Sequence, residues 1–166
     1  MRPLAWLLGA ACLSATLCSD RPARGELWFG PVVHLGSGVN AAGNEVGPCL
    51  AADGRDLYFA AGGELYRSTR SSLAEPFGLP TPLAELNTAA DDGGPNLSAD
   101  GLSLCFHSDR TGVSPKRQNI WTATRADTTS PFGAAICLPV VNGSWDDIDP
   151  ALSIDALSLY FSSNRN

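Results

Sequence analysis

Positive charge is scarce in this chain. Its 166 residues include 11 Lys and Arg against 17 Asp and Glu, which gives a formal net charge of −6 at pH 7. The basic residues are also dispersed, and only Lys116 and Arg117 are adjacent. Binding to a phosphate backbone or an anionic membrane surface needs clustered cations. The composition therefore argues against nucleic acid as a partner.

Long apolar stretches are also lacking. The stretch from Leu4 to Leu17 follows the positive start Met1-Arg2 and is too short to span a bilayer. A short positive start before a short apolar region is typical of a secretory signal peptide. We therefore predict a signal peptide over residues 1–25 and a mature chain that is exported to the periplasm, the cell envelope or the exterior, without a transmembrane segment.

The cysteines leave two questions open, a possible lipid anchor and a possible disulfide. A lipoprotein signal with its lipid at Cys12 or Cys18 is an alternative, although neither residue follows the Leu and small residues of the usual bacterial lipobox. The mature part keeps Cys49, Cys105 and Cys137, an odd number for an oxidising compartment. At most one disulfide can form among them, and the sequence leaves the pairing open.

The chain is rich in turn residues and contains a repeat. With 17 Gly, 12 Pro and 44% hydrophobic residues, it has the composition of a turn-rich all-β protein. A segment that begins with Gly-Pro or Asp-Pro recurs at residues 47–59, 94–106 and 149–161. A second element, Pro-Phe-Gly followed by an Asn, recurs at residues 76–87 and 131–142, with an earlier partial copy at 28–40. The second repeat is longer only between Phe106 and Trp121, which predicts a surface loop at residues 108–118.

Each repeat reads as four short antiparallel strands. The first strand runs into Leu50 or Leu97, and Ala-Asp-Gly forms a tight turn to the second. In the second repeat the later strands are expected at residues 102–106, 120–124 and about 135–138. Four such strands in each repeat describe a β-propeller blade.

The repeats predict an incomplete ring of blades. We expect a partial blade at residues 26–43, full blades at 44–90 and 91–145, and a partial blade at 146–166. Closed propellers have about four to eight blades. Either the chain is a truncated fragment or another chain supplies further blades, and we expect truncation because the sequence stops inside a repeat.

The second repeat carries a recognisable motif. Its Pro-x-Leu-Ser-x-Asp-Gly pattern at residues 95–101, then Leu104, Phe106 and Ser108-Asp109-Arg110, resembles the TolB-like propellers with WD40-like (PD40-type) repeats. The third copy departs at Ala156, where Gly is usual. The first has Ala51 in place of Ser and Ala-Gly-Gly at residues 61–63 in place of Ser-x-Arg. The resemblance covers about residues 26–166.

This resemblance implies a six-bladed ring and a non-catalytic, exported platform that binds a protein or another ligand in the bacterial cell envelope. The loop at residues 108–118 is then the expected contact surface. Two alternatives stay open: the propeller portion of an exported hydrolase, either a glycoside hydrolase or a serine peptidase, and a truncated nonfunctional fragment. No Gly-x-Ser-x-Gly motif, phosphate loop or zinc spacing is present, so we predict no catalytic residue, no cofactor and no metal site.

Cys105 and His107 are the residues that most resemble a catalytic pair. They lie two apart on a predicted strand and would share one face, as a Cys-His dyad requires. The other repeats place Tyr58 and Ala60 at these positions, which indicates variable packing residues rather than catalysis. His34 also occupies a variable position.

Acidic and aromatic residues give the remaining candidates. Asp91-Asp92 and residues 146–149 precede equivalent first strands and could hold Ca²⁺, but they lack the spacing of a calcium loop. We therefore predict solvated turn carboxylates there. We expect four aromatic residues to pack between blades: Tyr66, Phe106, Trp121 and Phe161. Trp145 is the candidate for an exposed contact.

Overall fold

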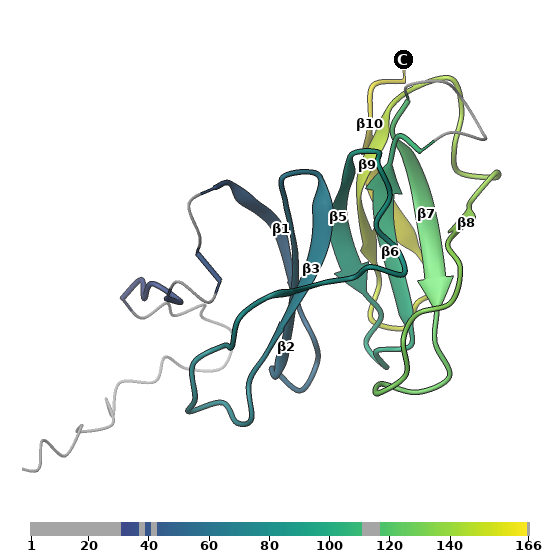
Figure 1. Cartoon of the computed structure of the whole chain (residues 1–166). Coiled ribbons are helices and arrows are strands. Elements are labelled where there is room, and N and C mark those ends of the chain that lie inside the picture. Colours follow the sequence, from purple (N-terminus) through teal and green to yellow (C-terminus); the bar gives the residue numbers. More distant parts are fainter. Residues whose placement is uncertain (1–30, 37–38, 41–42, 111–116, 166) are drawn as a thin grey trace, which may run out of the picture. The chain divides into compact units, whose positions relative to one another are not determined.

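The structure is a computed structural model that describes residues 31–36, 39–40, 43–110 and 117–165 (Figure 1). The chain divides into two units, Met1–Val33 and His34–Asn166, and all strands of the described residues lie in the second. The predicted signal peptide, with Cys12 and Cys18, and the first copy of the aromatic element at residues 28–30 lie outside the described residues. No helix in the described ranges is long and apolar enough to cross a membrane.

Two four-stranded sheets and one two-stranded sheet make up the described part of the second unit. The first sheet contains β1 (Glu45–Leu50), β2 (Asp56–Ala61), β3 (Glu64–Thr69) and β4 (Thr81–Pro82). The second contains β5 (Asp92–Leu97), β6 (Ser103–Ser108), β7 (Asn119–Thr124) and β8 (Ile136–Cys137), and the third contains β9 (Asp147–Leu152) and β10 (Leu159–Ser163). All strand pairs are antiparallel. The predicted all-β class, with blades of four antiparallel strands and an incomplete ring, is confirmed.

The Gly-Pro and Asp-Pro dipeptides form a β-bulge in the first strand of each sheet. The pairing register shifts between Val46 and Cys49 in β1, and equivalent shifts occur in the β5–β6 and β9–β10 pairs. The residue before each proline has a positive φ: 58° at Gly47, 56° at Gly94 and 51° at Asp149. Proline cannot donate to a ladder and is tolerated at such a bulge, which explains why the dipeptide recurs.

The Asp-Gly turns join the first and second strands as predicted. In the second sheet the Gly101 N–H donates to the Ser98 carbonyl at 2.8 Å with φ of 74°. Asp100 Oδ1 accepts from the Ser98 hydroxyl at 2.6 Å and from the Leu102 N–H at 2.9 Å. These bonds hold the pKa of Asp100 below its usual value. In the third sheet Ala156 takes the glycine position with φ of 55°.

The second repeated element holds the outer strands in place. Arg125 donates its Nε–H to the Gly101 carbonyl at 2.7 Å and stacks over the Phe132 ring at 4.5 Å. Asn142 accepts the Ile120 N–H at 2.7 Å and donates to the Ile120 carbonyl at 2.8 Å. In the first repeat, Arg70, Phe77 and Asn87 make the equivalent contacts. Because the Asn side chain replaces a ladder pair, β8 is only 2 residues long and shorter than predicted.

Side chains alternate between the two faces of each sheet. Tyr58 and Ala60 of β2 face the second sheet and share a core with Leu104 and Phe106 of β6. On the opposite face of the first sheet, a second cluster contains Val39, Leu57, Phe59 and Phe77. Successive sheets therefore pack face to face, as propeller blades do.

The prediction that four aromatic residues pack between blades can be compared with the structure residue by residue. Phe106 and Trp121 lie in the core between the first and second sheets, as predicted. Tyr66 stacks on Phe59 at 5.8 Å on the other face of the first sheet. Phe161 is half-buried beneath Arg165, whose guanidinium carbon lies 5.0 Å from the ring centroid.

Residue 156 provides a test of the turn. Glycine adopts a positive φ without the Cβ clash that alanine incurs, so we expect Ala156→Gly to stabilise the protein by about 0.5–1 kcal/mol. The reverse change, Gly101→Ala, should destabilise it, because the new Cβ lies 3.2 Å from Thr128 Cγ2. Urea unfolding of both variants measures the effect. A lower stability of Ala156→Gly would contradict this account of the turn.

Candidate functional site

The three β-bulges meet in one open groove of about 200 Å³. Its lining consists of equivalent positions from consecutive repeats: Gly47, Pro48, Gly94, Pro95, Asn96, Asp149 and Pro150. We call this the Gly-Pro groove. Because repetition of one backbone motif builds it, five of its seven lining residues are glycine or proline.

The backbones approach closely at the Gly-Pro groove. A Cβ on Gly94 would lie 2.7 Å from His107 Nδ1 and 2.9 Å from Asp149 Oδ1. A Cβ on Gly47 would lie 3.0 Å from Gly94 Cα. A side chain on Gly94 would displace His107 or Asp149, and one on Gly47 would crowd the Gly94 backbone, so packing as well as the positive φ favours glycine at both positions.

One side-chain position links each sheet to the next beside this groove. Cys49 Sγ accepts the Leu97 N–H at 3.2 Å, and Asn96 Oδ1 accepts the Leu152 N–H at 2.8 Å. Cys49 and Asn96 occupy the same place in their repeats. The cysteine therefore acts as a hydrogen-bond acceptor between sheets. All three described cysteines, Cys49, Cys105 and Cys137, are free thiols, which answers the open disulfide question.

Cys105 and His107 lie on β6 but do not bond to each other among the described contacts. Cys105 is buried, and its thiol lies 3.7 Å from the Thr122 hydroxyl. Burial raises the pKa of the Cys105 thiol, which makes it a poor nucleophile. His107 instead accepts the Asp149 N–H on Nδ1 at 3.1 Å. The two residues make separate packing contacts.

His107 packs behind two residues that line the Gly-Pro groove, Gly94 and Asp149. Its Nδ1 lies 3.7 Å from Asp149 Oδ1, and its ring packs against Gly93 and Gly94. Burial lowers the pKa of His107 below 6.5, against the opposing effect of the nearby carboxylates Asp149, Asp91 and Asp92. The neutral ring is favoured because Nδ1 must accept a hydrogen bond.

The prediction of solvated turn carboxylates is wrong for Asp92 and Asp147. Both are the first residues of strands, and both are fully buried. Asp92 forms an ion pair with Arg110 at 2.7 Å and accepts the Thr88 N–H at 2.7 Å. Asp147 pairs with Arg165 at 2.6 Å. The residues are buried because an arginine that lies later in each repeat neutralises them.

Arg110 also connects two sheets. It donates to the Leu86 carbonyl at 2.8 Å, in the segment that follows the first sheet, and to the Ser108 hydroxyl at 2.9 Å. Its guanidinium lies over the rings of Phe106 and Trp121. The Ser-x-Arg sequence thus holds the second sheet to the end of the first. Sequence reasoning missed this pair, although Asp and Ser-x-Arg occur together in the second and third repeats and are both absent from the first.

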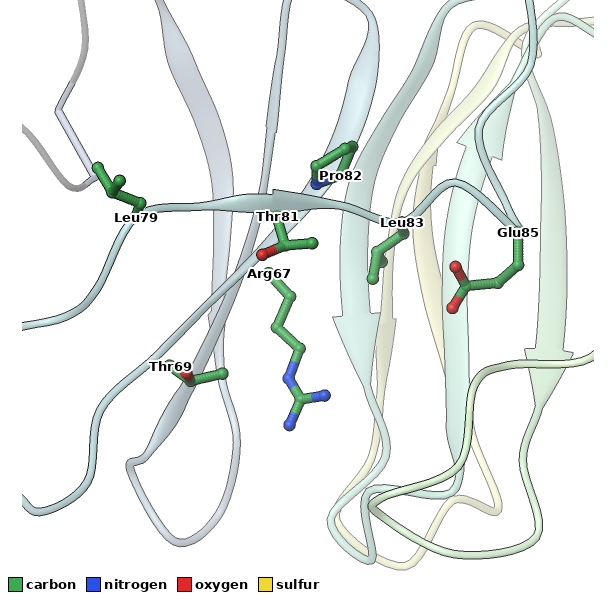
Figure 2. Close-up of a pocket in the computed structure, with 7 residues that line it drawn as sticks. All are labelled: Arg67, Thr69, Leu79, Thr81, Pro82, Leu83 and Glu85. Carbon is green, nitrogen blue, oxygen red and sulfur yellow. The ribbon is translucent and has the colours of Figure 1, made fainter.

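A second pocket, of about 250 Å³, lies at the outer strands of the first sheet (Figure 2). Its lining residues are Arg67, Thr69, Leu79, Thr81, Pro82, Leu83 and Glu85. Arg67 is paired with Asp56 at 2.8 Å. The repeat pattern did not predict this pocket, because Thr122 replaces Arg67 in the second repeat.

The predicted contact surface is described only in part. Residues 111–116 of the predicted loop lie outside the described residues. At the end of the predicted loop, Gln118 donates its N–H to Asp146 Oδ1 at 3.2 Å. Asp146 is the residue that follows Trp145 in the sequence. Trp145 is 42% exposed, as predicted, and lies 5.9 Å from the Arg165 guanidinium. Among the described residues no group of three or more potential metal ligands is present.

Comparison with known proteins finds likeness only among solved structures. No family model matches the chain, and no curated protein matches it. Among solved structures, it is similar to a putative TolB from Agrobacterium tumefaciens, with 18% sequence identity and a TM-score of 0.40. The match covers 74% of this chain and 55% of that one, so the chain spans about half the length of that structure.

Removal of Arg110 tests the buried ion pair. Arg110→Ala leaves the Asp92 carboxylate buried without its cation, and we expect a loss of about 3–5 kcal/mol in the free energy of unfolding. The double variant Arg110→Ala/Asp92→Asn removes the buried charge and should be more stable than Arg110→Ala alone. Chemical denaturation gives both values. A double variant as unstable as the single one would argue against a buried-charge cost.

His107 predicts a pH dependence of stability. Because its folded pKa lies below the unfolded value, the stabilisation is present above pH 6.5 and is lost as the pH falls through the folded pKa. His107→Gln should remove this part of the dependence between about pH 5 and pH 7, above the range where carboxylates titrate. An NMR titration should give a His107 pKa below 6.5. A value above 6.5 would contradict the role of burial.

Proposed function

We propose that this chain is a non-catalytic, exported propeller module that binds a protein or another ligand in the bacterial cell envelope. The proposal is supported by the structural contacts of the polar side chains that recur in the repeats. Asp92, Arg110, Arg125 and Asn142 are all engaged in bonds that hold strands and sheets together. The candidate nucleophile Cys105 is buried and has a raised pKa. A binding function requires neither a free set of polar side chains at these repeated positions nor a reactive thiol.

The observation that carries the proposal is the exposed Trp145 beside the predicted contact loop. Exposed tryptophans are common among the residues that contribute most to protein interfaces. Asp146, the next residue, bonds Gln118 at the end of the loop and lies 3.9 Å from Arg117. The loop and the aromatic side chain together form the proposed contact surface.

Substitution of Trp145 tests the proposed surface. The immobilised protein should retain a partner from envelope extract of the source bacterium, and Trp145→Ala should weaken retention by more than about tenfold. Val140→Ala is the matched control, because Val140 is apolar and 97% exposed.

The same preparation tests the non-catalytic part of the proposal. The purified protein should hydrolyse neither glycoside nor peptide substrates. Hydrolysis by the purified chain, or equal retention by wild type and Trp145→Ala, would overturn the proposed function.

A further inference from the structure

The pocket at the outer strands of the first sheet is lined by polar side chains that the blade does not need in order to form (Figure 2). The second sheet repeats the same strand register and the same turn after its fourth strand. Three polar lining residues of the first sheet are replaced at the equivalent positions of the second: Arg67 by Thr122, Thr81 by Ile136 and Glu85 by Val140.

The ion pair in this pocket is also specific to the first sheet. Arg67 pairs with Asp56 at 2.8 Å, and the second sheet has Ser103 at the position of Asp56. The second sheet nevertheless contains the same four strands. Neither Arg67 nor Asp56 is therefore explained by the requirements of the fold.

Arg67 presents a guanidinium that is only partly used. Among the described hydrogen bonds it donates through Nη2, to Asp56 Oδ2. Its side chain is 30% exposed. Thr69 and Thr81, which line the same pocket, are exposed and carry hydroxyls that can donate. A guanidinium accompanied by hydroxyl donors suits a carboxylate ligand.

Glu85 supplies the opposite charge to the pocket. It is exposed, and its Oε1 accepts the Phe132 N–H in a long hydrogen bond of 3.4 Å. Figure 2 shows its carboxylate turned toward the part of the pocket where Arg67 lies. Glu85 forms no ion pair with Arg67 or with any other cation in the described part of the chain. A ligand ammonium group would give it a counter-ion.

The size and the apolar lining of the pocket restrict the ligand further. Its volume of about 250 Å³ is below the range of about 300–1,000 Å³ that is usual for drug-sized ligands. Leu79, at one end of the lining, is 80% exposed. A ligand that fits must therefore be small, and an apolar side chain on it would cover Leu79.

We propose that this pocket binds a short peptide that has free termini and apolar side chains. The peptide carboxylate bonds Arg67 and the neighbouring threonine hydroxyls, and its ammonium group pairs with Glu85. The apolar side chains of the peptide pack on Leu79. This site shares no residue with the contact surface formed by Trp145 and the loop at residues 108–118, so either proposal can fail without the other.

The dipeptide Leu-Leu is the probe, titrated into the isotope-labelled full chain and followed by NMR. The backbone amide signals of Arg67 and Glu85 should shift and saturate. The N-acetylated dipeptide and the C-terminal amide of the dipeptide each lack one charge. Each should bind at least about tenfold more weakly than Leu-Leu, because each loses a charge-assisted hydrogen bond.

A variant of Glu85 tests the ammonium side of the site. Glu85→Gln keeps the shape of the side chain and removes its charge. It should bind Leu-Leu at least about tenfold more weakly and should no longer distinguish Leu-Leu from the N-acetylated form. Glu75→Gln is the matched control, because Glu75 is exposed and lies outside the pocket lining.

A double variant tests the carboxylate side. Asp56→Ser/Arg67→Thr gives the first sheet the residues that the second sheet has at these positions, so the blade should still fold. The double variant should no longer distinguish Leu-Leu from its C-terminal amide. It should still bind Leu-Leu better than the N-acetylated form, since Glu85 is unchanged.

Three results would overturn the proposal. The first is the absence of saturable shifts with Leu-Leu, and the second is equal binding of Leu-Leu and its two blocked forms. The third is an equal loss of binding in Glu75→Gln and Glu85→Gln, which would indicate a general effect of surface charge.

Discussion

The close backbone approach at the β-bulges is the constraint on which the stacking of the sheets depends. The first strands of the first two sheets approach so closely that a Cβ on Gly47 would lie 3.0 Å from Gly94 Cα. This approach places Cys49 and Asn96 within hydrogen-bond reach of the next sheet. The buried pair of Asp92 and Arg110 then closes the other end of the same strands. Each sheet is thus held to its neighbour at two places.

Much of the fold could be predicted from the sequence, because the repeat places equivalent strands and turns at equivalent positions. The strands that end at Leu50 and Leu97 and the Asp-Gly turns follow from local residue chemistry. The burial of Asp92 could not be predicted in this way, because it depends on Arg110, which reaches it only after the sheet has formed. The pocket around Arg67 was missed for a different reason, since the second repeat has Thr122 at that position and the repeat pattern therefore contains no signal for it.

Residues that recur in every repeat and residues that occur once have different roles in this protein. The recurrent glycines, prolines and asparagines build strands and junctions, and their contacts lie within the fold. Residues that occur in one repeat only, such as His107, Arg67 and Trp145, mark each sheet as different from its neighbours. The proposed contact with a partner rests on this second group.

The third sheet carries Asp149 and Ala156 in a backbone conformation that the other sheets reserve for glycine. Local opening of a protein begins where few contacts offset such strain. Strain at these two positions lowers the free energy that local opening of the segment from β9 to β10 requires.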